Sequence, residues 1–139
     1  MKKICYRKLR KYKYQLRDDY EIQIDITPEN KIETDFLILD TDGKLTIKKK
    51  YAWDGPSGPT IDTKNFMRGS LVHDALYQLI RLEHVSIEKR KYADDLLKEH
   101  CIQDGMSKFR AWYVHKAVRC FGKKSALATD EYTKLIYAP

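Results

Sequence analysis

The sequence predicts an α+β fold, in which a small antiparallel sheet is followed by a bundle of three or so helices. Two observations predict it: residues 1–52 contain short segments with alternating apolar side chains, whereas residues 64–139 repeat apolar side chains at helical spacing. A loop rich in glycine and proline, residues 53–63, separates the two parts. Because 139 residues with 42% hydrophobic side chains suffice for one core, we expect residues 1–139 to form a single domain.

Three segments of the first half are predicted to be strands. Residues 20–26 place isoleucines at alternate positions and polar side chains between them, and residues 45–51 alternate in the same way. Residues 35–40 form a short apolar run. The Asp42-Gly43 pair that follows is typical of a hairpin turn, because glycine tolerates a positive φ. These segments predict antiparallel pairing.

The second half is predicted to be helical. Apolar side chains recur at helical spacing over residues 64–81, and Thr63 can cap that helix. The remaining helices are expected over residues 86–103, 107–120 and 129–136, with Ser86 as a cap and with Gly105 and Gly122 as the residues that end the second and third helices.

The loop Trp53-Asp54-Gly55-Pro56-Ser57-Gly58-Pro59 fixes an unusual backbone path. Such a path can point backbone carbonyl groups in one direction, and Asp54 adds a carboxylate. Oxygen ligands of this kind suit a hard cation such as Ca²⁺. The candidates are Asp54 and Gly55 for metal binding, and Trp53, Ser57 and Gly58 for substrate contact. For the loop taken alone, an ordinary turn between strand and helix, with Trp53 packed in the core, is the favoured interpretation.

His73 and Asp74 lie within the otherwise apolar helix over residues 64–81. Neighbouring helical residues point about 100° apart, so the two cannot share one face. A buried charge needs a partner or a metal, and Tyr77 lies on the same face as His73, four residues later. For the doublet taken alone, a structural histidine beside a surface aspartate is the favoured interpretation.

Asp94 shares a helical face with Leu97 and Cys101, which predicts that it faces the core or the preceding helix. There it can meet His73, with Nδ1 of the ring on Asp94, and stabilise the charged imidazolium. The alternative for Asp94 is an ion pair with Lys98. Asp95 is expected to form an ion pair at the surface with Lys91 or Lys98.

Charge and cysteine content bear on partners and location. A net charge of +7 suggests an anionic partner, or simply a solvated surface. The N-terminal segment interleaves basic residues with tyrosines (Tyr6, Tyr12 and Tyr14) and could bind nucleic acid, although a solvated strand is favoured. Three widely spaced cysteines, no signal-peptide pattern and no membrane-spanning segment predict a reduced, cytoplasmic protein.

Four segments resemble a family of small, uncharacterised phage and prophage proteins: YAWDGPSGPT, LVHDALY, RKYADDLL and FRAWYVHKAVRCFG. The resemblance covers roughly residues 35–122. It implies a phage or prophage context, and with it the cytoplasm of a bacterial host, but it implies no particular activity.

The order of Asp54-Gly55, His73-Asp74 and Ala93-Asp94 is also similar to the catalytic core of phospholipase A2 enzymes, especially the small bacterial type. That similarity implies His73 as the general base for an attacking water, Asp94 as the residue that orients it, and Asp74 with Asp54 as calcium ligands. Pro56 and Val72 stand where those enzymes have cysteines, so a secreted, cross-linked lipase is not expected.

Three functions follow as hypotheses. The first is a calcium-dependent hydrolase of an ester, such as that of an anionic phospholipid, with His73, Asp94 and Tyr77 in the catalytic group. The second is a non-enzymatic phage assembly or binding module in which the same residues form a buried polar network. The third is a basic nucleic-acid-binding protein. The sequence does not predict an oligomeric state.

Overall fold

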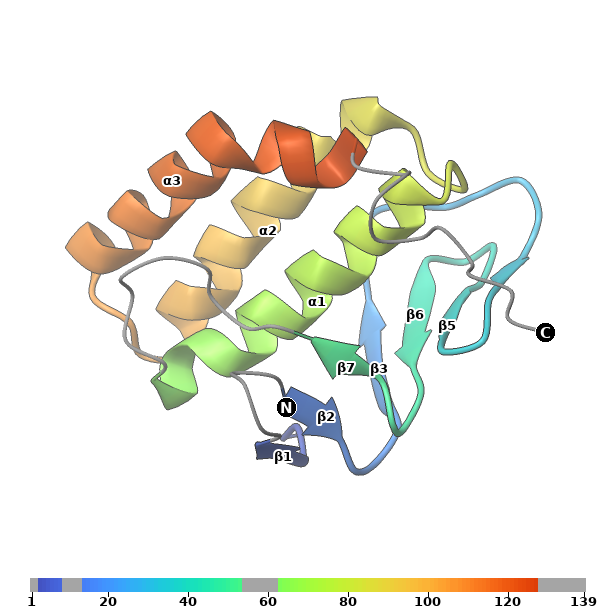
Figure 1. Ribbon diagram of the computed structural model, residues 1–139, viewed down its shortest axis with the longest axis horizontal. Coiled ribbons are helices and arrows are strands. Elements are labelled where there is room, and N and C mark those ends of the chain that lie inside the picture. Colours follow the sequence, from blue (N-terminus) through green and yellow to red (C-terminus); the bar gives the residue numbers. More distant parts are fainter. Residues whose placement is uncertain (1–2, 9–13, 54–62, 128–139) are drawn as a thin grey trace, which may run out of the picture. The chain divides into compact units, whose positions relative to one another are not determined.

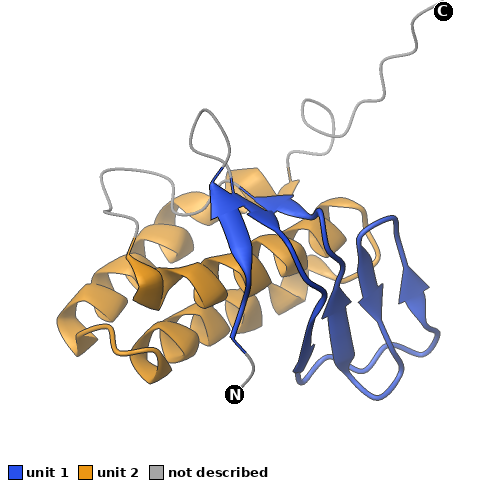
Figure 2. Cartoon of the chain, turned by 90° about the horizontal axis from the view of Figure 1, so that it is seen from below, with its two compact units in different colours: residues 1–61 blue, residues 62–139 orange. Residues whose placement is uncertain are grey.

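The computed structural model describes residues 3–8, 14–53 and 63–127, and it confirms the α+β class. Strands occupy the N-terminal half and helices the C-terminal half (Figure 1). The chain divides into two compact units, Met1–Ile61 and Asp62–Pro139, which Figure 2 shows in different colours.

The first unit contains a four-stranded antiparallel sheet in the order β3-β6-β5-β4. Its strands are β3 (Tyr20–Gln23), β4 (Ile32–Glu33), β5 (Leu37–Leu39) and β6 (Lys44–Ile47). Leu37 lies opposite Ile47 and Leu39 opposite Leu45, and all four side chains are fully buried. The three predicted strands and the hairpin between the last two are confirmed, and Gly43 has the positive φ of 89° that its turn requires.

A second antiparallel sheet of the same unit, in the order β1-β2-β7, was not predicted. It contains β1 (Tyr6–Lys8), β2 (Tyr14–Leu16) and β7 (Ala52–Trp53). Tyr14 lies 5.6 Å from Tyr6 and 5.7 Å from Trp53 between ring centroids. Tyr14 and Trp53 are buried. Trp53 therefore ends a strand inside an aromatic cluster, which matches the interpretation favoured for this residue.

The second unit consists of α1 (Lys64–Arg81), the short 3₁₀ turn η1 (Ile87–Lys89), α2 (Arg90–Gln103) and α3 (Lys108–Leu127). Each of the three α-helices packs against the other two. Their shared core contains buried side chains from all three helices and from the α2–α3 connection: Phe66, Leu97, Cys101, Met106, Ala111 and Val114.

The helix boundaries are predicted well, with one exception. Residues 64–81 are helical as expected, the Ser86 hydroxyl accepts a hydrogen bond from the amide of Glu88, and Gly105 has a φ of 101° just after α2. Thr63 directly precedes α1, but its side chain makes no capping hydrogen bond, because its hydroxyl donates to Asn65 Oδ1 instead. Gly122 does not end the third helix, because α3 continues to Leu127. The helix expected over residues 129–136 lies outside the described residues.

Candidate active site

Three side chains of the helical unit meet at one carboxylate. Asp94 of α2 is completely buried, and its Oδ1 lies 2.7 Å from His73 Nε2 and 2.6 Å from the Tyr77 hydroxyl. His73 and Tyr77 are one turn apart on α1, and their ring centroids are 4.1 Å apart. The expected meeting of His73, Tyr77 and Asp94 therefore occurs, but His73 uses Nε2 where we expected Nδ1.

The other carboxylate oxygen faces arginines. Arg119 of α3 donates from Nη1 to Asp94 Oδ2 at 2.9 Å, and Arg90 Nη1 lies 4.0 Å from the same oxygen. Arg90 also donates from Nη2 to the backbone carbonyl of Arg119. One carboxylate thus connects all three helices, and no ion pair between Asp94 and Lys98 occurs in the described part of the chain.

Gly122 forms part of the same arrangement. A Cβ atom at this position would lie 2.5 Å from the Tyr77 hydroxyl oxygen and 3.3 Å from two carbons of its ring. Because real Cβ atoms do not approach this closely, only glycine leaves room for the hydroxyl where it bonds to Asp94. The glycine is thus required by packing inside α3, and it does not end the helix because it does not adopt the positive φ of a helix-ending glycine.

The charge state of Asp94 follows from these contacts. Burial alone would raise the pKa of this carboxyl group, but the hydrogen bonds from His73 and Tyr77 and the charge of His73 lower it, and the pKa lies below the ordinary 3.8. Arg119 adds to the lowering. Asp94 is therefore ionised at neutral pH and can only accept hydrogen bonds.

The protonation of His73 follows in turn. Since ionised Asp94 has no proton to give, Nε2 must carry the proton of their shared hydrogen bond, and neutral His73 is left with an unprotonated Nδ1. Burial lowers the pKa of His73, but the hydrogen bond to Asp94 and the negative charges of the nearby Asp74 and Asp94 together raise it above 6.5. Nδ1 lies 3.8 Å from Asp74 Oδ1.

Tyr77 is held as a hydrogen-bond donor. Burial and the neighbouring Asp94 carboxylate raise the pKa of its hydroxyl far above the ordinary 10, so it stays protonated. Its geometry makes it a support for Asp94, because its hydroxyl contacts that carboxylate.

Only one of the three expected metal ligands lies in the described residues. Asp74 is partly exposed beside His73, whereas Asp54 and Gly55 lie outside the described residues, as do Ser57 and Gly58. Residues 3–8, 14–53 and 63–127 contain no group of three or more His, Cys, Asp or Glu side chains suited to a metal ion. A calcium site would need several further oxygen ligands beside Asp74.

Asp95 forms the expected surface ion pair and one contact more. Its carboxylate lies 2.6 Å from Lys91 Nζ and 2.7 Å from His115 Nε2. This cluster is separate from Asp94, because adjacent helical residues point in different directions. Asp95 therefore provides a matched control for Asp94.

Sequence reasoning missed Arg90, Arg119 and Gly122. Arg90 precedes Asp94 by four residues, a spacing that signals a helical ion pair. Arg119 and Gly122 are three residues apart and so share one face of α3. Their sequence carries no local sign that this face meets Asp94 and Tyr77.

The N-terminal segment is only partly described. Tyr14 is buried and thus cannot stack on a base, and Arg7 donates a hydrogen bond to Gln15. Residues 9–13, which include Tyr12, lie outside the described residues. Cys5, Cys101 and Cys120 are free thiols.

No family model, curated protein or solved structure was found to match this chain. The two resemblances noted from the sequence therefore stay hypotheses. Within the described residues, none of the helices combines the length and the apolar character that a membrane span requires.

Proposed function

We propose that this protein is an ester hydrolase in which His73 is the general base. The observation that carries the proposal is the pairing of His73 Nε2 with Asp94 Oδ1 at 2.7 Å. It leaves the second ring nitrogen unprotonated in neutral His73, and that nitrogen lies toward the partly exposed Asp74. A histidine held in one tautomer by an ionised carboxylate is a common arrangement for proton abstraction.

Each residue has a distinct part in the reaction. Nδ1 of His73 takes a proton from a water molecule as the water oxygen attacks the ester carbonyl. The imidazolium that forms is stabilised by Asp94 and by Asp74, and it returns the proton to the departing alkoxide. Asp94 and Tyr77 are positioning residues, because they act through His73.

Calcium is the cofactor that the resemblance implies, and Asp74 is the described residue that would contribute a ligand. When bound, calcium would supply a Lewis acid for the developing oxyanion. Calorimetric titration with Ca²⁺ tests this part: we expect saturable binding by the wild type and by Asp95→Asn, and its loss in Asp74→Asn. Equal binding by the wild type and Asp74→Asn would exclude Asp74 as a ligand.

The substrate class follows from charge as well as from chemistry. The chain carries a formal charge of +7, which favours an anionic ester over a cationic one. An anionic phospholipid combines an ester bond with a negative headgroup. It is therefore the first substrate to test, together with water-soluble carboxylic esters.

Hydrolysis assays on His73→Gln test the proposal, with His84→Gln as the control because His84 is exposed. Loss of a general base lowers rates by about 10²–10⁴-fold, so we expect a loss in this range for His73→Gln and none for the control. Both variants should first be shown to be folded by circular dichroism. Full activity of folded His73→Gln would refute the proposal, as would the absence of hydrolysis by the wild type across both substrate classes.

A second candidate function is a non-enzymatic phage assembly or binding module. It is favoured by the complete burial of Asp94 and by its contacts with all three helices, which suit a structural network. In that case His73→Gln and Asp94→Asn would change stability, and no ester would be hydrolysed.

A further inference from the structure

The outer face of α3 is apolar to an unusual degree. The five most exposed large hydrophobic side chains of the described residues all lie on this helix: Phe121 (81%), Phe109 (77%), Leu127 (52%), Tyr113 (48%) and Trp112 (47%). Large apolar side chains that gather at a surface mark a site of interaction.

Three of these side chains follow or border one helical stripe together with Trp112, whereas Phe121 points about 100° away from the neighbouring Cys120 and lies outside the stripe. Phe109, Tyr113 and Leu127 share one stripe with Lys116, Cys120 and Lys124, because successive members are three or four residues apart. Trp112 and Lys123 border the stripe, and the buried Ala111 and Val114 lie on the opposite side. From Phe109 to Leu127 the stripe is about 27 Å long at 1.5 Å per residue.

The same helix is strongly basic. α3 contains four lysines and two arginines and no acidic residue, so it supplies six of the seven net positive charges of the chain. Arg110 donates a hydrogen bond to the Thr63 hydroxyl, and Arg119 donates one to the Asp94 carboxylate. The four lysines are exposed, and none forms an ion pair within the described residues. Lys116 lies over the Trp112 ring at 5.1 Å.

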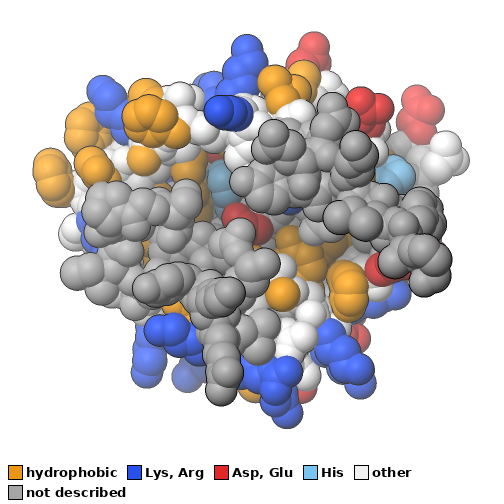
Figure 3. All heavy atoms as spheres, in the orientation of Figure 1, with side chains coloured by type: hydrophobic (Ala, Val, Ile, Leu, Met, Phe, Trp, Pro, Cys, Tyr) orange, Lys and Arg blue, Asp and Glu red, His pale blue; other side chains and the backbone are white. Residues whose placement is uncertain are grey.

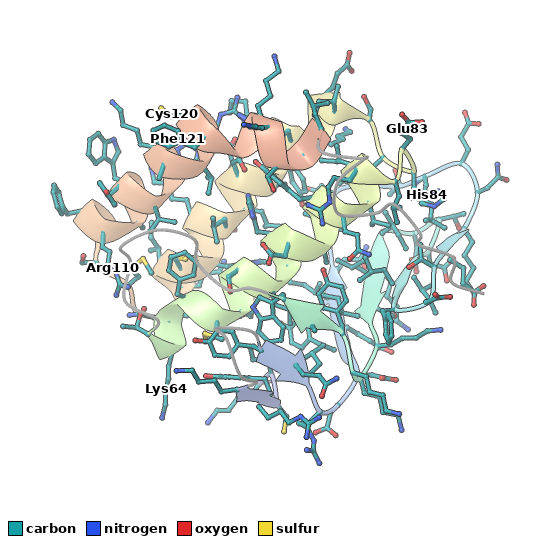
Figure 4. The ribbon with its side chains drawn as sticks, in the orientation of Figure 1. Lys64, Glu83, His84, Arg110, Cys120 and Phe121 are labelled. Carbon is teal, nitrogen blue, oxygen red and sulfur yellow. The ribbon has the colours of Figure 1, made fainter. Side chains whose placement is uncertain are left out.

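Hydrophobic and basic side chains gather together over α3 at the upper left of Figure 3, and Figure 4 labels Cys120 and Phe121 side by side on this helix. From this we propose that α3 is a docking surface for an anionic lipid bilayer. Helices that lie in a membrane interface combine Trp, Phe and Leu with Lys in this way. The inference rests on α3 alone and does not depend on the proposed hydrolase.

The chemistry of the face favours a bilayer over other partners. At a bilayer, lysine stems cover apolar surface while their ammonium groups reach the anionic headgroups. At a protein interface each lysine among the aromatic rings would need an acidic partner, because otherwise its ammonium group would lose its hydration without compensation. Single-stranded nucleic acid is bound in grooves by stacking, whereas Leu127 cannot stack and a single helix is convex.

Trp112 provides a natural probe, because Trp53 is buried and Trp112 is 47% exposed. The full chain should bind vesicles of equal parts phosphatidylcholine and phosphatidylglycerol, with a shift of Trp112 fluorescence to shorter wavelength. Binding to pure phosphatidylcholine should be weaker. The fluorescence shift should be absent in Trp112→Phe.

Two pairs of variants test the face itself. Phe109→Ser should weaken vesicle binding at least about tenfold, since a buried Phe side chain contributes more than that factor, whereas the exposed Phe36→Ser should not. Lys124→Glu should also weaken it, whereas Lys31→Glu should have a smaller effect.

Several results would overturn the proposal. The first is equal binding to neutral and to anionic vesicles. The second is vesicle binding that neither Phe109→Ser nor Lys124→Glu weakens. The third is a protein that binds oligo-dT but does not bind vesicles. A dimer in solution that Phe109→Ser dissociates would also overturn it, because a second copy of the chain would then cover this face.

Discussion

Gly122 offers the sharpest test of the packing around Asp94. In the interior of a helix, Gly→Ala normally stabilises a protein by about 0.5–1 kcal/mol. Here the added methyl group would lie 2.5 Å from the Tyr77 hydroxyl oxygen. Tyr77 cannot move aside easily, because its hydroxyl is bonded to Asp94. The added methyl group therefore overpacks the site, which costs about 1–3 kcal/mol, and disturbs a hydrogen bond to a charged group. Together these costs outweigh the gain in helix propensity. We expect Gly122→Ala to lower the free energy of unfolding by about 2 kcal/mol.

A double-mutant cycle with Tyr77→Phe isolates the cause. Removing the hydroxyl leaves only ring carbons at 3.3 Å from the new methyl group, which small adjustments can accommodate. In the Tyr77→Phe background, Gly122→Ala should therefore be close to neutral, and the coupling energy should be about 2 kcal/mol. Tyr77→Phe by itself should cost about 1–3 kcal/mol, because it removes a hydrogen bond to a buried charge.

Urea unfolding followed by circular dichroism measures all four proteins of the cycle. Lys123→Ala is the control for the helix, because Lys123 is exposed and adjacent, and its effect should stay within about 0.5 kcal/mol. The reasoning would be refuted if Gly122→Ala stabilised the protein equally in both backgrounds, as it would in a helix free of this contact.

Three further predictions concern stability. Asp94→Ala should lower the free energy of unfolding by about 3–5 kcal/mol, because it leaves buried partners without an acceptor, while Asp95→Ala should cost under about 1 kcal/mol; similar losses in urea unfolding would contradict this. Burial lowers the pKa of His100 to about 4, so the folded state binds this proton less readily than the unfolded state. The free energy of unfolding should therefore be unaffected by His100 above pH 6.5 and should fall by about 3 kcal/mol as the pH decreases toward 4. His100→Gln should remove this fall, and an unchanged pH dependence of unfolding would contradict the assignment. Arg119→Gln should raise the pKa of Asp94, whose contribution is lost as the pH falls, so acid unfolding should begin at a higher pH; an unchanged or lower midpoint would contradict it.

The sequence predicts those elements of the fold whose residues show a clear local pattern, such as helical periodicity or a characteristic turn. Helix α1 repeats apolar residues throughout, and the Asp42-Gly43 turn has a distinct backbone requirement. Strands β1, β2 and β7 contain only two or three residues each and carry mostly polar or aromatic side chains. The pairing of β2 with β7 brings together segments far apart in the chain, which no local pattern specifies.

The candidate site was predicted to the same extent: the contacts that helical spacing specifies were found, and those that depend on tertiary packing were not. Tyr77 follows His73 by one helical turn, and Asp94 lies on an apolar stripe of the next helix. Arg119 reaches Asp94 from 25 residues away, and this contact depends on the rotation of α3. Which nitrogen of His73 faces Asp94 depends on a side-chain torsion that spacing does not determine.

The central claim is that His73 is a base held by Asp94 through Nε2, and nitrogen-15 NMR of the histidine ring during a pH titration tests it most directly. We predict that neutral His73 carries its proton on Nε2, that its pKa lies above 6.5, and that Asp94→Asn lowers that pKa. His73→Gln assigns the resonances. A proton on Nδ1 in the neutral ring, or a pKa below 6.5 that Asp94→Asn leaves unchanged, would contradict the claim.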